Sequence, residues 1–170
     1  LAANVLTLNA AATAAGSNIA CTFTNTKLPT ITLTKVSNGG VGGFTFTGTN
    51  GWASQTITTV TSGVGVAGAT QTLTAAATAT TITESIPPGY FLTAVSCSGL
   101  GSGGTATSNL SAGALDFDAA ATAAGSNITC TFTNGVPSFT ITKAVDLANV
   151  AAPATLTYTI TIQNTGSVTL

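Results

Sequence analysis

The sequence predicts an all-β protein built from tandem β-sandwich domains. Threonine alternates with Val, Ile, Leu or Phe through many short runs, which is the pattern of strands with one buried face. Residues 11–25 (AATAAGSNIACTFTN) return almost unchanged as residues 120–134 (AATAAGSNITCTFTN), at a spacing of 109 residues. That spacing is typical of one small β-sandwich, so the chain contains parts of successive domains.

Each expected strand follows from this alternation. Apolar residues take every second position and threonines take the others, so one face of each strand packs into a core. The alanine-rich stretches at 72–79 and 119–124 contain threonines and adjoin strands, which favours extended structure, with one short helical turn as the alternative. The clearest strands lie at 30–35, 44–47, 80–84, 129–134 and 156–162.

Pro29 and Pro137 indicate the domain boundaries. Each follows a copy of the CTFTN motif and precedes a strand that ends in lysine, Lys35 in one case and Lys143 in the other. Linkers this short, and stiffened by proline, predict a semi-rigid rod of adjacent domains. The predicted units are the last strands of a preceding repeat at 1–27, one complete sandwich at 28–135, and the first strands of a following sandwich at 136–170.

The composition excludes several functional classes. Charged residues make up 4% of the chain, with three lysines, no arginine and no histidine. Three lysines cannot form a basic patch, so we expect neither nucleic acid nor an anionic membrane as a partner, and no apolar run is long enough for membrane insertion. We predict no cofactor and no metal site. Asp116 and Asp118 share a strand face, but two carboxylates fall short of a calcium site, and we interpret them as solvated.

The three cysteines fit the same domain division. Cys97 and Cys130 both lie in the complete domain, where we expect a disulfide, with two buried free thiols as the alternative. Cys21 occupies the position of Cys130 in the earlier copy, so we interpret it as unpaired by truncation. A disulfide favours an oxidising, extracellular setting.

Three polar residues occupy the inward phase of predicted strands. Lys35 alternates with Ile31 and Leu33, and Glu84 and Asn134 alternate in the same way with the apolar residues of their own strands. Burying an isolated charge is costly, so residues of this kind are either paired with one another or used in chemistry.

The complete domain resembles the Cna B-type, or prealbumin-like (SpaA-like), domains of bacterial surface proteins and pilins. The resemblance is carried by the ITLTK strand at 31–35, a phenylalanine-bearing second strand, the segment TESIPPGY at 83–90, and a final strand that ends in Asn134. It implies an immunoglobulin-like or prealbumin-like sandwich. It also implies an internal isopeptide bond, with Lys35 as the nucleophile, Asn134 as the electrophile and Glu84 as the catalyst.

Physical chemistry explains why such a site needs these residue types. Burial beside aromatic rings favours the neutral lysine amine and the protonated glutamate, and contact with the amide supplies the proximity that the reaction needs. The alternative is an ordinary buried ion pair between Lys35 and Glu84, with Asn134 as a hydrogen-bonding partner. Residues 141–166 resemble the opening of the DUF11 repeats of large bacterial surface proteins.

We therefore predict a structural repeat of an extracellular bacterial surface stalk, fibre or filament, stiffened by covalent cross-links within its domains. Expected partners are neighbouring copies or domains in a polymer, because the strand edges carry few of the charges that prevent pairing. The alternative is an adhesive module that binds carbohydrate or host protein, for which Trp52 and Tyr90 could form a stacking platform, although a place in the core or at its rim is the commoner outcome for such aromatic residues. No enzyme activity is predicted apart from the self-directed isopeptide reaction.

Overall fold

Two facing β-sheets form the centre of the molecule, as the alternation predicts. The structure is a computed structural model that describes residues 5–169, so the first four residues of the predicted 1–27 unit and the last residue of the 136–170 unit lie outside it. Within residues 5–169 no helix forms, so no helix there is long and apolar enough to cross a membrane.

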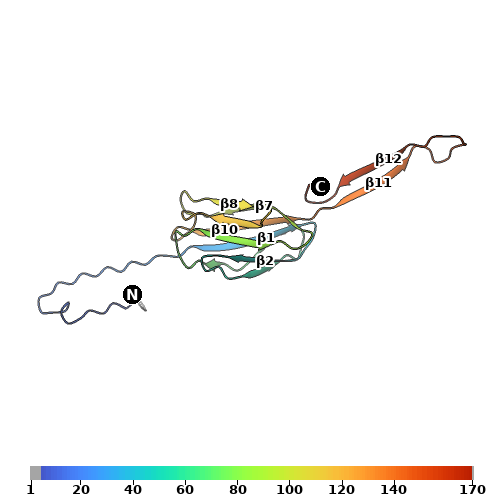
Figure 1. Cartoon of the computed structure of the whole chain (residues 1–170). Coiled ribbons are helices and arrows are strands. Elements are labelled where there is room, and N and C mark those ends of the chain that lie inside the picture. Colours follow the sequence, from blue (N-terminus) through green and yellow to red (C-terminus); the bar gives the residue numbers. More distant parts are fainter. Residues whose placement is uncertain (1–4, 170) are drawn as a thin grey trace.

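One sheet has the strand order β4-β1-β10-β7, with β5 also paired to β1. Strands β1 and β10 are parallel neighbours at its centre, although they are the first and last strands of the sandwich (Figure 1). The strands of this sheet are β1 (Thr30–Asn38), β4 (Val66–Ala67), β5 (Gln71–Thr72), β7 (Phe91–Ser98) and β10 (Asn127–Gly135).

The second sheet has the order β3-β2-β6-β9-β8 and is antiparallel throughout. Its inward side chains meet those of the first sheet in one core, in which Phe44, Phe46 and Phe132 are fully buried. Its strands are β2 (Gly43–Gly48), β3 (Gln55–Thr58), β6 (Thr80–Ser85), β8 (Ala106–Asn109) and β9 (Ala114–Phe117).

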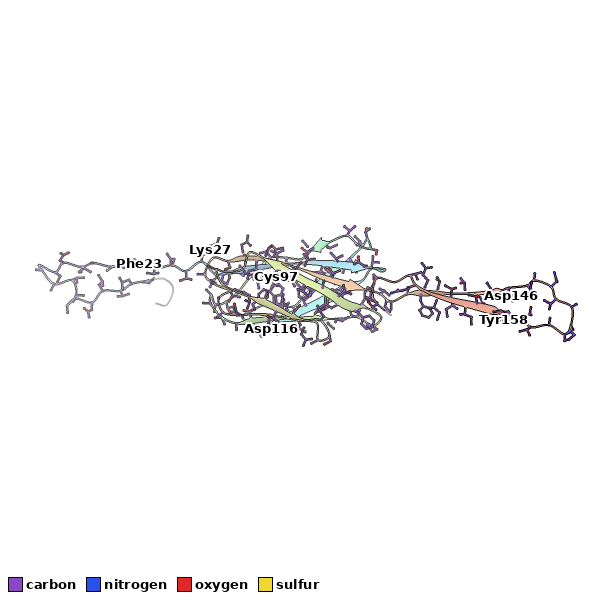
Figure 2. The ribbon with its side chains drawn as sticks, turned by 90° about the horizontal axis from the view of Figure 1, so that it is seen from above. Phe23, Lys27, Cys97, Asp116, Asp146 and Tyr158 are labelled. Atoms are coloured by element: carbon purple, nitrogen blue, oxygen red, sulfur yellow. A yellow bond between two sulfur atoms is a disulfide. The ribbon has the colours of Figure 1, made fainter. Side chains whose placement is uncertain are left out.

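Two segments extend from opposite ends of the sandwich (Figure 1). At one end, residues 5–27 form no strand and are almost entirely exposed. At the other, β11 (Phe139–Val145) and β12 (Tyr158–Asn164) form an antiparallel hairpin whose residues are all exposed. Figure 2 shows Phe23 on the first segment and Tyr158 on the second, both outside the packed core that lies between them.

The expectation of extended structure at 119–124 is wrong. Residues 119–122 and 124–125 form turns, because Asp118 accepts a hydrogen bond from the Ala121 amide at 2.7 Å and Gly125 adopts a φ of 79°. A short polar side chain that bonds the backbone three residues on, followed by a glycine in the left-handed region, favours turns over a strand.

Candidate functional site

Strand β1 carries Lys35 into the core. Ile31, Leu33, Lys35 and Ser37 occupy successive inward positions, and all four are completely buried. The period of two that places the isoleucine and leucine in the core therefore places the lysine there as well. Its ammonium lies deep in the sandwich, out of contact with solvent.

Strand β10 places Asn134 next to this lysine. In the parallel register of β1 and β10, Phe132 lies opposite Lys35 and Asn134 lies opposite Ser37. The pairing of β10 with β7 shifts by one residue between Thr133 and Asn134, which is a β-bulge. The extra residue lies on β7, and β10 keeps its period of two through Phe132 and Asn134, so the Asn134 amide is fully buried beside the lysine.

The opposite sheet supplies Glu84. Thr80, Ile82 and Glu84 alternate inward on β6, and Glu84 pairs across the sheet with Phe46 of β2. The glutamate side chain is completely buried. The three inward polar residues singled out in the sequence are thus brought together from three strands and both sheets.

Distances at the site are those of direct contact. Lys35 Nζ lies 2.6 Å from Asn134 Oδ1 and 3.3 Å from Glu84 Oε1. The same nitrogen donates to the backbone carbonyls of Val36 at 2.9 Å and Phe132 at 3.1 Å. The amine is therefore held in one position, against both the amide and the carboxyl group.

Aromatic rings exclude water from the site. The Phe44 ring centroid lies 4.3 Å from Lys35 Nζ, and the Phe46 and Phe132 rings pack edge to face with their centroids 5.1 Å apart. Burial lowers the pKa of Lys35 from 10.5 to about 8, although the Glu84 carboxylate acts in the opposite direction. Burial also raises the pKa of Glu84, opposed by the nearby lysine. Both shifts favour the neutral forms of the two groups.

Several polar atoms of the site have no hydrogen-bond partner. Glu84 Oε1 forms the ion pair with Lys35 but no hydrogen bond, and among residues 5–169 the buried Glu84 Oε2 and Asn134 Nδ2 atoms have no hydrogen-bond partner. Unpaired buried polar groups are rare in folded proteins and destabilise them. The cluster therefore buries polar groups that the fold does not fully satisfy.

The disulfide prediction is confirmed. Cys97 of β7 and Cys130 of β10 lie directly opposite each other and are bonded. Strand β10 thus contributes both to the disulfide and to the lysine site. Cys21 is free and exposed on the N-terminal segment.

Two other candidates have structural roles. Trp52 is only 6% exposed and belongs to the core, which is the commoner outcome for such a residue and leaves it unable to serve as a stacking platform for carbohydrate. Tyr90 packs against Phe44 and donates a hydrogen bond to the Val41 carbonyl.

Asp118 accepts hydrogen bonds from Thr105 and the Ala121 amide, which lower its pKa. No cluster of metal-ligating side chains occurs in the described part of the chain.

Comparison with known families gives one match. A family model for a prealbumin-like fold domain of the SpaA class matches residues 31–136. The chain belongs to this family. The SpaA-class match covers more than half of the chain and contains the lysine, the glutamate, the asparagine and both bonded cysteines. No curated protein and no solved structure matches. Domains of this family are typical of pilus and surface proteins, which supports a structural role at a cell surface.

The sequence did not reveal two contacts that hold the amine. The carbonyl of Val36, the residue that follows Lys35 on β1, accepts one hydrogen bond from the amine. The Phe132 carbonyl accepts another, and its position depends on the parallel pairing of β1 with β10. Parallel pairing of the first and last strands leaves no local signal in the sequence, because every residue has the same carbonyl group.

Proposed function

We propose that residues 28–135 are a load-bearing unit of an extracellular bacterial surface stalk, fibre or filament, locked by an isopeptide bond between Lys35 and Asn134. The observation that carries the proposal is the 2.6 Å contact between the buried amine and the asparagine amide, beside a buried carboxyl group. An amine, an amide and an acid held together in a water-free core are the reactants and the catalyst of an intramolecular condensation.

The reaction is redox-neutral and needs no cofactor. The neutral Lys35 amine attacks Cγ of Asn134, while protonated Glu84 donates a hydrogen bond to Oδ1 and stabilises the developing negative charge. Glu84 then transfers a proton from the attacking nitrogen to Nδ2. The bond between Cγ and Nδ2 breaks, ammonia leaves, and Nζ keeps one hydrogen in the new amide. The product lacks both the buried ammonium and the unpaired Nδ2 group, which favours completion.

The topology explains why this bond would suit a fibre. Tension along an array of domains enters the sandwich at the start of β1 and leaves at the end of β10, and these two strands are neighbours. Hydrogen bonds alone would let them slide apart under load. A covalent bond between Lys35 and Asn134 joins the two strands directly, so tension passes across it and the rest of the domain is protected.

Intact mass tests the bond. We expect the purified chain to weigh less than its sequence by one ammonia, beyond the hydrogens lost at the disulfide, and fragmentation to join the peptides that contain Lys35 and Asn134. Glu84→Ala should restore the ammonia mass, whereas Asp116→Ala, on the neighbouring strand β9, should leave the loss intact. A full sequence mass for the folded, unsubstituted chain would overturn the proposal.

The wider role follows from the arrangement of the flanking segments. Residues 5–27 and the β11–β12 hairpin leave opposite ends of the sandwich, as expected for one unit of a linear array (Figure 1). We assign residues 136–170 to the start of a DUF11-like sandwich, with adjoining domains as the partners. Electron microscopy of longer natural arrays should show rods, and flexible beads would contradict this role. The adhesive alternative loses its proposed platform, since Trp52 is buried.

A further inference from the structure

The N-terminal segment repeats strands β9 and β10 of the sandwich without their environment. Residues 5–25 align with residues 114–134 and differ from them at five positions. Phe132 is fully buried, whereas its equivalent Phe23 is 62% exposed, and Ile19 is 43% exposed where Ile128 is fully buried. The segment therefore carries a complete set of inward side chains that no described residue covers.

Its loop has already adopted the conformation of the buried copy. Asn9 Oδ1 accepts a hydrogen bond from the Ala12 amide at 2.9 Å, as Asp118 does from Ala121. The Ser17 amide bonds the Ala14 carbonyl, as the equivalent residues of the buried copy do, and turns occupy 10–13 and 15–16 as they do 119–122 and 124–125. Gly16 has a φ of 86° and its equivalent Gly125 a φ of 79°. The turn is therefore formed, whereas the residues on either side of it form no strand.

The sandwich of the same chain cannot be that partner. Its β10 position is filled, and Asn127 and Asn134 lie beside Thr30 and Ser37 of β1. If Asn25 lay beside Ser37 instead, the chain from Asn25 to Thr30 would have to cover the distance between Ser37 and Thr30 along β1. Its five residue steps reach about 18 Å at full extension, whereas the seven steps along the strand cover about 23 Å. The segment cannot reach this position in its own domain.

We propose that residues 5–25 are the closing strand pair of a second sandwich of the same class, locked there by Cys21 and Asn25. The acceptor must offer a cysteine on the strand antiparallel to the segment, as Cys97 does for Cys130, and an inward lysine on the parallel strand, as Lys35 does for Asn134. The role of Asn25 rests on the proposed isopeptide chemistry, whereas the strand closure and the role of Cys21 are independent of it.

The acceptor is a domain on the N-terminal side of this one in the same polypeptide. A second copy of this chain already has its β10 position filled and covalently held by the disulfide. The segment leaves the sandwich at the end opposite the β11–β12 hairpin, where a preceding unit of a linear array would adjoin (Figure 1). Only residues 26–29 separate the last aligned position from β1, so the two sandwiches would be close neighbours.

Both bonds balance. Formation of the Cys21 disulfide removes two electrons and two protons from a pair of thiols, and an extracellular disulfide oxidant accepts them and becomes a dithiol. Formation of the Asn25 isopeptide expels one ammonia and involves no redox change.

The first experiment asks whether the sequence of the segment can close a sandwich of this class. In the full chain, five substitutions convert residues 114–134 into the sequence of residues 5–25. We expect one cooperative unfolding transition, the Cys97–Cys130 disulfide, and a melting temperature lowered by about 5–10 °C, mainly through the smaller Leu at position 117. The substitutions are Ala114→Val, Asp116→Thr, Phe117→Leu, Asp118→Asn and Thr129→Ala.

A matched control adds Thr131→Phe and Phe132→Thr, which moves the aromatic ring to the outer face; this chain should not unfold cooperatively. Loss of cooperative unfolding or of the disulfide in the five-substitution chain would overturn the inference. If that chain folds without losing ammonia while the original chain loses it, the Asn25 lock is wrong. If neither chain loses ammonia, the proposed function fails and strand closure stands.

The second experiment supplies an acceptor. A second copy of residues 28–113 is placed directly before residue 5 of the chain, so that residues 5–25 follow it in the register of residues 114–134. We expect free thiols to fall from one per chain to none, with Cys21 bonded to Cys97 of the added copy. Two free thiols would overturn the inference.

The unmodified chain tests the source of the acceptor. Oxidised protein at high concentration should sediment as a monomer with Cys21 free. A dimer that contains a bond between Cys21 of one copy and Cys97 of another would show that a second copy is the acceptor, and would overturn the assignment to a preceding domain.

Discussion

Strands β1 and β11 carry nearly the same sequence, TITLTK at 30–35 and SFTITK at 138–143, but in opposite environments. Lys35 is fully buried, with its Nζ 4.3 Å from the Phe44 ring, and it contacts Glu84. Lys143 is exposed, with its Nζ 3.9 Å from the exposed Tyr158 ring. Both lysines thus lie over an aromatic ring at similar distances, and only one of them has a second sheet above it.

The difference separates what a strand determines from what its partners determine. Alternation fixes which face of the strand carries the lysine. The covering sheet then removes water, lowers the pKa of Lys35 and brings the Glu84 carboxyl group to it, whereas the Asn134 amide comes from the neighbouring strand β10 of the same sheet. Within the described part of the chain nothing covers the equivalent face of β11, so the Lys143 side chain remains exposed to solvent. The environment of the lysine is therefore set by the assembled sandwich rather than by the strand motif.

The largest expected effect comes from removing each lysine. Lys35→Met should abolish the ammonia loss and destabilise the protein by about 4–5 kcal/mol, because the proposed bond closes a loop between residues 99 apart in sequence. Lys143→Met should change the free energy of unfolding by less than about 0.5 kcal/mol, as expected for an exposed position. Chemical denaturation and intact mass measure both effects. Equal effects of the two substitutions would contradict the comparison.

Much of the sandwich and its site could be predicted from the sequence, for a definite physical reason. A period of two reports which side chains point inward, so Lys35, Glu84 and Asn134 stood out as polar residues in apolar phases. The repeat and the cysteine positions identified Cys97 and Cys130 as partners, and the disulfide is present. The inward phase is a local signal that can be read within one strand, and the repeat is recognised by comparing two segments of the sequence directly.

What could not be predicted depends on contacts between distant strands. The parallel pairing of β1 with β10 brings the Phe132 carbonyl to the amine and places Asn134 opposite Ser37. The turns at 119–122 depend on the Asp118 side chain, whose signal was outweighed by the surrounding alanines and threonines. Burial of Trp52 agrees with the commoner outcome for an aromatic residue, although the sequence alone did not show which core residues would surround it.

The two aromatic partners provide the next test. Phe44→Ala should cost about 3 kcal/mol or more, because it opens a cavity beside Lys35 and admits water to the site. Tyr158→Ala should cost less than about 1 kcal/mol, since a cation–π contact at an exposed site contributes little. Thermal and denaturant unfolding report both. A cost at Tyr158 as large as that at Phe44 would mean that the hairpin is covered in solution.

The pH dependence of stability tests the burial of the Lys35 amine. Asn134→Ala leaves this amine uncrosslinked, with its folded-state pKa lowered from 10.5 towards the value of about 8 found for the site. Between these two values the unfolded chain binds more protons than the folded one. The free energy of unfolding should therefore rise as pH increases from about 8 to 10.5, and this contribution should be constant below that window.

The double variant Asn134→Ala/Lys35→Met is the control, because it retains every other titrating group. The difference between the two profiles of unfolding free energy against pH isolates the contribution of Lys35. That difference should be smaller than the loss of unfolding free energy caused by Lys35→Met in the cross-linked protein. The double variant Asn134→Ala/Lys143→Met should keep the rise. A flat difference profile would show that water reaches the Lys35 amine.

The smallest expected difference concerns the residue two positions beyond each lysine. Ser37 is buried in β1, donates to the Gly40 carbonyl at 2.8 Å and shares a hydrogen bond with Thr59 at 2.7 Å, whereas Val145 takes the same place in β11 and is 40% exposed. Ser37→Val should cost about 1 kcal/mol, because it leaves the Gly40 carbonyl without this donor. Val145→Ser should be neutral within error, because water replaces any lost contact. If the valine were tolerated at position 37, the β1 pocket would have to admit water or rearrange, and the dry environment assigned to the neighbouring lysine would be wrong.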